Sequence, residues 1–206
     1  MTMFNDQQTT TTAAVPAVAA STDLWVRRAV AVAAFAALTA VGARLSVPLP
    51  GTPVPFTLQP VAVLLAGLLL GPILGAGSQF AYLALGAAGL PVFAAGGGLA
   101  YFGGPTGGYL MAFPVAAAVA GWIVGDPKAC PVFQRVLRTG TAAVAGLATL
   151  HLGGASWLAL QPWLAGGSAD VFRVAFEPFL LGDLLKVALV AVVTVGLGGR
   201  VRRLLG

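Results

Sequence analysis

Long apolar runs, separated by glycine, proline or charged residues, follow one another along the chain from residue 24 onward. They predict six apolar spans, at residues 24–45, 60–71 (or from 56), 72–89, 105–125, 140–160 and 177–199. An α-helix rises about 1.5 Å per residue and a bilayer hydrocarbon core is about 30 Å thick, so the longer runs can cross it as helices. A single helix over 60–89 would be about 45 Å long. The break at Gly71-Pro72 therefore predicts two short spans joined by a tight turn.

Three irregular segments separate these spans on one side of the predicted bundle. Residues 47–55 contain four prolines, which exclude a helix there. Residues 90–108 are rich in glycine, and residues 161–176 form a third loop. Irregular backbone near membrane depth is tolerated only where protein buries it or where it lines a cavity. The three loops therefore predict a pocket on this side.

Composition indicates a membrane protein rather than a soluble one. Hydrophobic residues make up 58% of the chain and charged residues only 8%, whereas soluble domains carry about 25% charged residues. The predicted fold class is an all-α integral membrane protein with six transmembrane helices, over residues 23–203. Residues 1–22 are rich in Thr and Ala and are expected to form a disordered cytoplasmic tail, and residues 204–206 are the C-terminal end.

Basic residues predict the orientation. If the six spans start with the N-terminus inside the cell, Arg44 and Arg173 lie outside and Lys186 lies within a span. An inverted five-span arrangement separates the charges less well, at seven against three. Cytoplasmic loops carry the excess of Lys and Arg, so both termini are predicted to be cytoplasmic, in the cell membrane, and the net charge of +5 indicates topology and not nucleic-acid binding. The basic residues expected inside are Arg27, Arg28, Lys128, Arg135, Arg138, Arg200, Arg202 and Arg203.

Small residues recur at every fourth position in two of the spans. Gly67, Gly71 and Gly75 form one such stripe, and Ala29, Ala33 and Ala37 form another. In lipid, stripes of this kind let helix backbones approach closely. Packing inside the bundle explains either stripe, and docking to another membrane subunit is an alternative for the first span.

Asp183 and Lys186 stand out because ionisable groups inside a membrane span are costly and usually functional. They are three residues apart, so they share one helix face near the outer side. A lysine offers an ammonium to a carboxylate, and an aspartate accepts from N–H groups. The pair either neutralises itself and stabilises the bundle or belongs to a ligand site, and the loops on the same side favour the ligand site.

The loops bring further side chains that suit a small amphipathic ligand. Gln59, Thr106 and the tyrosine hydroxyls are candidate polar contacts. The candidate apolar walls are Phe56, Phe93, Tyr101, Tyr109 and Trp163.

Catalysis and metal binding are not expected. Cys130 and His151 are the single cysteine and histidine, too few for a zinc or haem site built on several such ligands. Lys128 and Lys186 follow Pro127 and Leu185, so the Gly-Lys-Ser/Thr of a phosphate-binding P-loop is missing. No spacing supports a hydrolase triad around His151. We expect no catalytic residue, metal or cofactor, and we interpret His151 as a hydrogen-bonded structural residue.

Four motifs occur in order: VPFTLQ at 54–59, GLPVF at 89–93, GPTGGYL at 104–110 and PFLLGDLLK at 178–186. Together they resemble the BioY family, the biotin-specific substrate-capture components (S components) of energy-coupling-factor (ECF) transporters. The resemblance covers about residues 24–203.

The resemblance implies a six-helix membrane fold that binds biotin near the outer face, under the loops. It implies that Asp183 and Lys186 contact the ligand, and that Ala29, Ala33 and Ala37 dock on a transmembrane coupling subunit. The ATP-binding cassette ATPase subunits would be separate chains, in agreement with the missing P-loop. The remaining expected substrate contacts are Phe56, Thr57, Gln59, Phe93, Thr106 and Tyr109.

The predicted function is therefore capture of biotin from outside and its delivery inward, without enzymatic chemistry. The biotin carboxylate is expected to pair with Lys186, while Asp183 either accepts a ureido N–H or orients Lys186. Three alternatives remain at this point: a capture subunit for another vitamin such as thiamine or riboflavin, a membrane-embedded enzyme, and a structural membrane scaffold.

Overall fold

The computed structural model describes residues 17–126, 131–161 and 168–205. Of the features named above, residues 1–16 of the expected tail, Lys128, Cys130 and Trp163 lie outside the described residues. The α-helices are α1 (Ala17–Arg44), α2 (Gln59–Leu70), α3 (Pro72–Ala87), α4 (Gly107–Val124), α5 (Val132–Ala159), α6 (Ser168–Ala175) and α7 (Leu180–Leu204). Two 3-10 helices, η1 (Leu99–Gly103) and η4 (Glu177–Phe179), and two strands, β1 (Ser46–Val47) and β2 (Phe56–Thr57), complete it.

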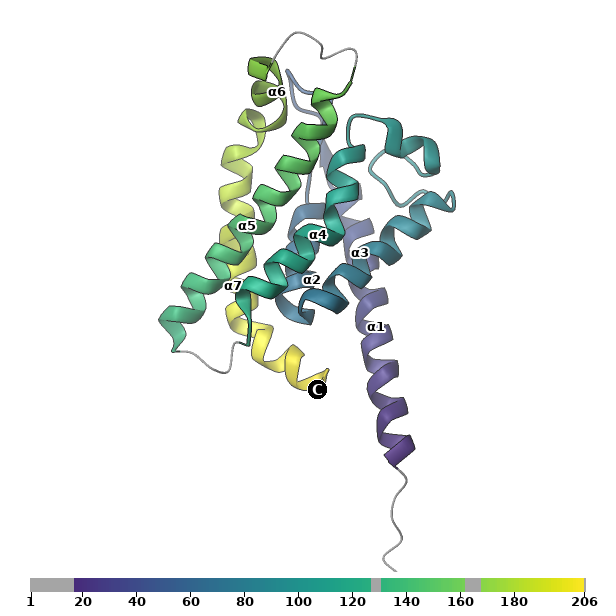
Figure 1. Ribbon diagram of the computed structural model, residues 1–206, viewed down its shortest axis with the longest axis vertical. Helices are drawn as coiled ribbons and strands as arrows, with labels where there is room; N and C mark the ends of the chain where they lie inside the picture. Colours follow the sequence, from purple (N-terminus) through teal and green to yellow (C-terminus); the bar gives the residue numbers. More distant parts are fainter. Residues whose placement is uncertain (1–16, 127–130, 162–167, 206) are drawn as a thin grey trace, which may run out of the picture.

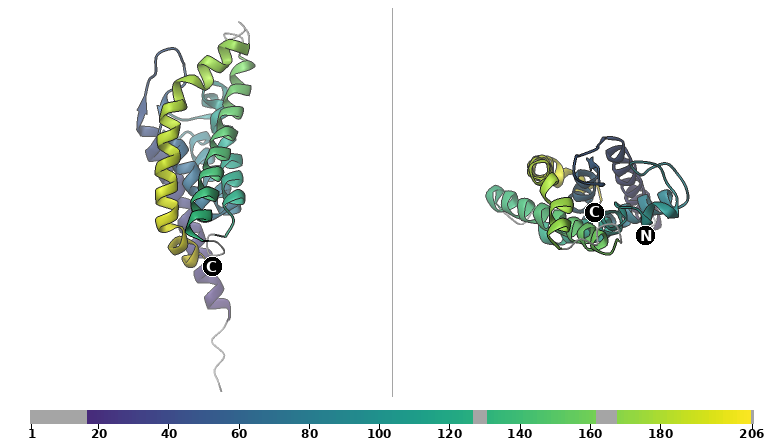
Figure 2. Two further views of the ribbon diagram at one scale, coloured as in Figure 1. Left: turned by 90° about the vertical axis from the view of Figure 1, so that its left-hand side faces the viewer. Right: turned by 90° about the horizontal axis from the view of Figure 1, so that it is seen from above.

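The helices form a bundle along one long axis (Figure 1; Figure 2). The first residues of α1 and the end of α7 lie at the same end of it, and α6 lies at the opposite end. Arg202 closes the bundle near α7's end by donating to Leu68 O at 2.9 Å and to Gly125 O, carbonyls at the C-terminal ends of α2 and α4. This end carries the clustered arginines and is therefore the end predicted to be cytoplasmic.

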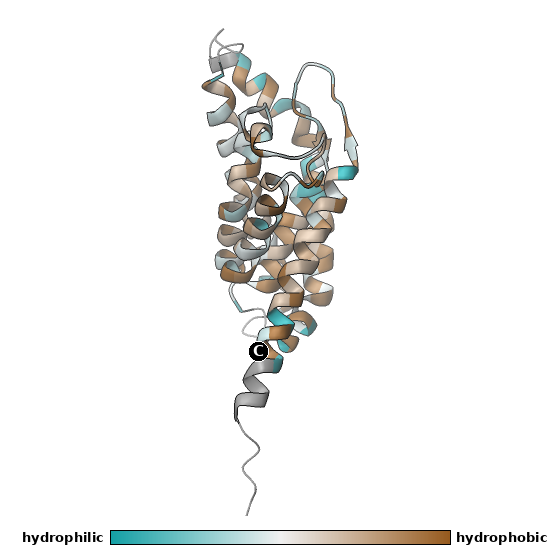
Figure 3. Ribbon diagram, turned by 90° about the vertical axis from the view of Figure 1, so that its right-hand side faces the viewer, coloured by the Kyte–Doolittle hydropathy of each residue, from teal (hydrophilic) through white to brown (hydrophobic). Residues whose placement is uncertain are grey.

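Four helical segments are long and apolar enough to cross a membrane: Asp23–Arg44, Gly107–Val124, Val132–Ala159 and Asp170–Leu204. Large apolar side chains such as Val30, Phe80, Trp122 and Val192 lie exposed on the outside, and apolar residues dominate the middle of the bundle (Figure 3). Such a surface is stable in lipid and not in water. The remaining two predicted spans are the shorter helices α2 and α3.

The turn between α2 and α3 is where the sequence predicted it. Gly71 has a φ of 86°, which favours glycine. The glycine stripe packs inside the bundle: a Cβ on Gly67 would lie 2.0 Å from Ala117 O on α4, and one on Gly75 would lie 2.7 Å from Gly67 Cα. The interpretation as internal packing is therefore confirmed for Gly67 and Gly75, whereas Gly71, where a Cβ would meet nothing within 4 Å, forms the turn.

Helix α2 has 12 residues and is about 18 Å long, well short of the bilayer core. The antiparallel hairpin of β1 and β2 lies between α1 and α2 in the chain, toward the end of the bundle that carries α6 (Figure 2). Most of α2 is buried. A short buried helix below a hairpin leaves room for a cavity above its N-terminus.

Several predicted boundaries differ from the structure. Helix α1 begins at Ala17, so residues 17–22 of the expected tail are helical. Helix α5 begins at Val132 and not at 140, and α7 continues to Leu204. Hydropathy shows where a helix leaves the hydrocarbon core, which need not be where the helix ends. A helix can continue beyond this boundary when its arginine side chains reach into the polar headgroup layer.

The loop predicted at 161–176 contains a helix that the sequence pattern did not predict, α6. Its Val171, Val174 and Ala175 pack against a small apolar cluster with Val54 and Phe179. The helix has eight residues, three of which have charged or hydroxyl side chains. Its apolar run is therefore too short to be recognised from the sequence next to the long apolar run of a membrane span. The helix forms because its one apolar face is covered.

Candidate functional site

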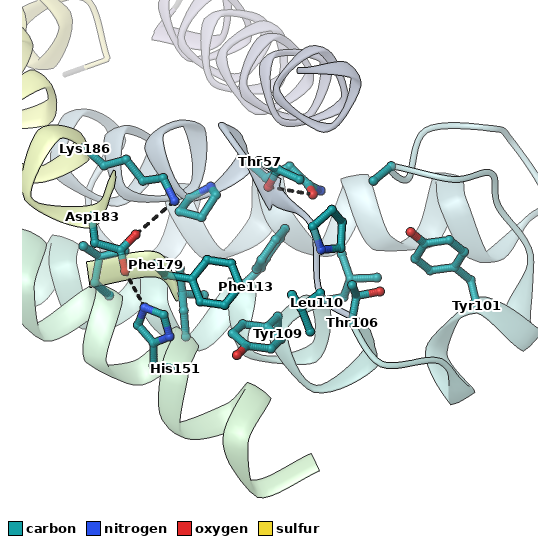
Figure 4. Close-up of a pocket in the computed structure, with 17 residues that line it drawn as sticks. Thr57, Tyr101, Thr106, Tyr109, Leu110, Phe113, His151, Phe179, Asp183 and Lys186 are labelled. Carbon is teal, nitrogen blue, oxygen red and sulfur yellow. Dashed lines mark hydrogen bonds and ion pairs between the residues drawn. The ribbon is translucent and has the colours of Figure 1, made fainter. Parts of the chain in front are cut away.

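An enclosed cavity lies between the hairpin and helices α4, α5 and α7; we call it the inner cavity. Lys186, Asp183 and His151 line one part of it, and Thr106 and Tyr101 line another (Figure 4). Most of its wall is apolar, with Phe113, Leu147, Leu150 and Phe179 among the lining side chains. The charged groups are therefore concentrated in one region of an apolar chamber.

His151, Asp183 and Lys186 form what we call the ionic cluster. Lys186 Nζ lies 2.9 Å from Asp183 Oδ1, and His151 Nε2 lies 2.5 Å from Asp183 Oδ2 (Figure 4). Lys186 and Asp183 are both buried. The predicted sharing of one helix face by these two residues is confirmed, and Asp183 joins α7 to α5.

Phe56 lies beneath the lysine. The Lys186 ammonium is 4.0 Å from the centroid of the Phe56 ring, a cation–π contact that favours the charged amine. Gly182 allows this approach, since a Cβ there would lie 2.2 Å from a Phe56 ring carbon. The glycine that precedes Asp183 in the last motif thus has a packing function.

Thr57 and Gln59 lie at the base of the inner cavity in a hydrogen-bonded chain. Thr57 Oγ1 donates to Gln59 Oε1 at 3.3 Å, Gln59 Nε2 donates to Tyr82 Oη at 2.6 Å, and Tyr82 donates to Val92 O at 3.1 Å. The buried amide is therefore held in one orientation. A fixed polar group of this kind can select a ligand by its donors and acceptors.

Tyr109 and His151 meet at one carbonyl. Tyr109 Oη lies 2.9 Å and His151 Nδ1 3.0 Å from Ala175 O, the last residue of α6. These contacts connect α4 and α5 to the segment above the cavity. Phe176 stacks on the imidazole at a centroid distance of 5.0 Å.

Phe93, a predicted contact, lies outside the inner cavity in an aromatic cluster. Its ring is fully buried, and its centroid lies 5.5 Å from the ring centroid of Tyr82 and 4.9 Å from that of Tyr101. It therefore supports Tyr101, which lines the cavity, from behind. The other predicted contacts either line the cavity (Asp183, Lys186, Gln59, Thr57, Thr106 and Tyr109) or, for Phe56, contact Lys186.

His151 lines the inner cavity although it was not among the predicted substrate contacts. Both of its ring nitrogens have hydrogen-bond partners, as expected of a structural histidine, but one partner is the central carboxylate of the ionic cluster. An ionisable residue in mid-span was the available signal. Its partner lies 32 residues later on another helix, and local spacing cannot reveal such a contact.

A second, more open cavity, the vestibule, lies between residues 46–55 and residues 94–106. It has a volume of about 430 Å³ and shares Pro55, Ala94, Tyr101 and Thr106 with the inner cavity, whose volume is about 60 Å³. Ligand pockets usually measure about 300–1,000 Å³. A ligand of vitamin size that reaches the ionic cluster must therefore extend into the vestibule or move the loops.

The bundle and its cavities define a class: a helical integral membrane protein with a cavity at the end opposite the start of α1 and the end of α7. A model of the BioY family matches residues 9–203. "Probable biotin transporter BioY" of Pyrococcus horikoshii is 43% identical over 82% of this chain and 94% of its own, and "Biotin transporter BioY" of Thermotoga maritima is 38% identical over 79% and 90%. The chain belongs to the BioY family.

A solved structure agrees with this assignment. The S component for biotin of an ECF-type ABC transporter superimposes with a TM-score of 0.72 and 29% identity, over 84% of this chain and 91% of that one. The predicted fold class and family are confirmed by these matches. The fold is thus that of an S component, a class of transporter subunit and not of enzyme.

Proposed function

We propose that this protein captures biotin at the outer side of the cell membrane and delivers it inward as the S component of an ECF-type transporter. The observation that carries the proposal is the buried Lys186 ammonium at the inner end of an apolar, outward-facing chamber. A buried charge is costly unless it is paired, and a carboxylate ligand supplies a partner. Relatives named as biotin transporters support the choice of ligand.

The geometry favours one of the two roles considered for Asp183. Each of its carboxylate oxygens already faces a nitrogen, one of Lys186 and one of His151. Asp183 therefore orients Lys186 toward the substrate carboxylate, and the ureido ring lies farther out, toward Thr106 and Tyr101. The fused rings contact the apolar walls between these two ends.

Equilibrium binding tests the proposal. We expect labelled biotin to bind the purified chain in detergent, and unlabelled biotin to displace it while thiamine and riboflavin do not. Displacement by one of the other vitamins would identify a different substrate for the same fold. A monodisperse sample that binds none of the three would contradict the proposed function.

The proposed partners are a transmembrane coupling subunit and separate ATP-binding cassette subunits. Ala29, Ala33 and Ala37 all lie exposed on α1, and they offer a smooth face on which another helix can pack closely. Among the described residues, these three side chains are not part of the buried core. Docking of the coupling subunit gives them a function.

Ala33→Leu is expected to leave biotin binding within about twofold of wild type but to reduce uptake in cells that contain the coupling and ATPase subunits. The added side chain separates helix backbones that must touch, and tight packing is the main force between helices in lipid. Ala148→Leu, at an exposed position of α5, is the matched control and should leave uptake unchanged. Equal uptake by both variants would contradict the proposal that the coupling subunit docks on these alanines.

A further inference from the structure

A further cavity, the basic pocket, has a volume of about 190 Å³ and lies where α1, the turn between α2 and α3, and the end of α7 meet. The end of α7 is at the end of the bundle away from α6 (Figure 1). The basic pocket is therefore separate from the inner cavity and the vestibule. Its lining residues are Arg28, Leu70, Gly71, Leu74, Arg202 and Leu205.

Two guanidinium groups line the basic pocket, and their hydrogen-bond acceptors are neutral carbonyls. Arg28 donates to Leu205 O from Nε at 3.3 Å and from Nη2 at 3.2 Å. Arg202 donates to Leu68 O at 2.9 Å and to Gly125 O, and its buried Nε has no acceptor among the described residues. A guanidinium has five N–H groups. In the described part of the chain, both arginines therefore retain donors for a further acceptor.

Carboxylates balance the charge of the basic pocket only in part. Asp126 interacts electrostatically with Arg202. Asp23, the other described carboxylate at this end of the bundle, forms an ion pair with Arg27. Two guanidinium groups thus face the charge of one carboxylate, and an anion in the pocket would complete the balance.

The start of α3 adds a field that also favours an anion. Gly71 is the N-cap of this helix and Leu74 lies in its first turn, where amide groups have no acceptor within the helix. The positive end of the helix dipole attracts negative charge. The opposing end of α2 is partly capped, because Leu68 O accepts from Arg202. The helix end thus supports the site that the two arginines define.

Neighbouring side chains indicate that the basic pocket lies at the level of the lipid headgroups. Trp25 is three residues before Arg28 on the same face of α1 and is 70% exposed, and tryptophan is enriched at membrane interfaces. Ile73, next to Leu74 in the chain, is 84% exposed, as suits contact with hydrocarbon. A ligand with a charged head and an apolar tail fits this combination.

We propose that the basic pocket binds the phosphate of an anionic phospholipid. Guanidinium groups match phosphate oxygens by paired hydrogen bonds, and basic pockets between transmembrane helices on the cytoplasmic side bind anionic headgroups. The depth of the pocket and the exposed apolar surface beside it favour a lipid over an acidic side chain of a partner protein. The lipid joins α1 to the end of α7, and its binding does not depend on the substrate of the inner cavity.

Native mass spectrometry of the full chain in a nonionic detergent tests the proposal. Phosphatidylglycerol should bind saturably, and phosphatidylcholine with the same acyl chains should bind about tenfold more weakly because its headgroup has no net charge. Inorganic phosphate at millimolar concentration should not displace the lipid, because it has no acyl chains. Equal binding of the two lipids would overturn the proposal, and displacement by inorganic phosphate would identify a soluble phosphate compound as the ligand instead.

Arg28→Gln should weaken the binding of phosphatidylglycerol by about tenfold, because hydrogen bonds between charged groups are stronger than neutral ones. Arg203→Gln is the matched control: it removes the same charge from an exposed position at the same end of α7, outside the pocket. Water and salt screen such a charge, so the affinity of the control should stay within about threefold of wild type. Equal losses in the two variants would reduce the site to a general attraction of basic surface for lipid and overturn the proposal.

Leu74→Trp provides a second variant, because Arg28 also holds Leu205 O and its loss could loosen the end of α7. The larger side chain fills the basic pocket without changing its charge, so it should weaken the binding of phosphatidylglycerol as well. Wild-type lipid affinity in Leu74→Trp would overturn the proposal. So would an Arg28→Gln variant that binds the lipid normally but no longer assembles with the coupling subunit, since the pocket would then be a protein docking site.

Discussion

Lys186→Met should weaken biotin binding by about a hundredfold or more. Methionine keeps much of the apolar stem but removes the ammonium that donates to Asp183 and that we propose pairs with the ligand carboxylate. Removing one partner of a buried, hydrogen-bonded charge pair costs about 2–5 kcal/mol, and each 1.4 kcal/mol is about tenfold in affinity. Titration of the purified variant with labelled biotin measures the loss. Asp183 retains His151 as a partner, so the bundle is expected to stay folded.

Arg173→Met provides the control for this prediction. Arg173 is an exposed basic residue of α6 at the same end of the bundle, and it does not line the inner cavity. Exposed charges are screened by water and salt, so its removal should change biotin affinity by less than about threefold. If Lys186→Met bound biotin as tightly as Arg173→Met, the ammonium would not be the carboxylate partner.

Gly67→Ala should have the largest effect on stability. A Cβ at this position would lie 2.0 Å from Ala117 O, a backbone atom that cannot rotate away. Helices α2 and α4 would have to separate, and overpacking of a tight core costs about 1–3 kcal/mol and occasionally more. We expect a lower unfolding temperature in detergent and a smaller monodisperse fraction in size-exclusion chromatography.

Gly77→Ala on α3 is the matched substitution for this second test. An added Cβ at Gly77 meets nothing within 4 Å. Alanine is also the better helix former, by up to about 1 kcal/mol, so the variant should unfold at or slightly above the wild-type temperature. Similar unfolding temperatures for the two variants would mean that the contact between Gly67 and Ala117 does not limit helix approach.

The sequence predicted the parts of the fold that depend on local composition. Apolar runs identified the spans, and the dipeptide Gly71-Pro72 identified the turn between α2 and α3. Spacing of three placed Asp183 and Lys186 on one face, because a helix repeats every 3.6 residues. These features need no knowledge of which helices are neighbours.

The rest of the candidate site depends on contacts between distant segments. His151 and Asp183 belong to helices whose packing no local pattern specifies, and Phe93 is as aromatic as Tyr101 although only Tyr101 reaches the cavity. Helix α6 is stable because its apolar face meets side chains from the proline-rich hairpin loop. Each of these outcomes is a property of the assembled bundle.

The short α2 helix and the vestibule above it also determine where the membrane voltage acts. If the vestibule opens to the outside as proposed, water that fills it would carry the external potential toward the inner cavity, and most of the voltage would fall across the part of the bundle that contains α2. An anion that enters from outside crosses little of this field, but release to a negative cell interior opposes it by about 2.3 kcal/mol per charge per 100 mV. The electrical work of moving an anionic vitamin therefore falls on the release step and not on capture.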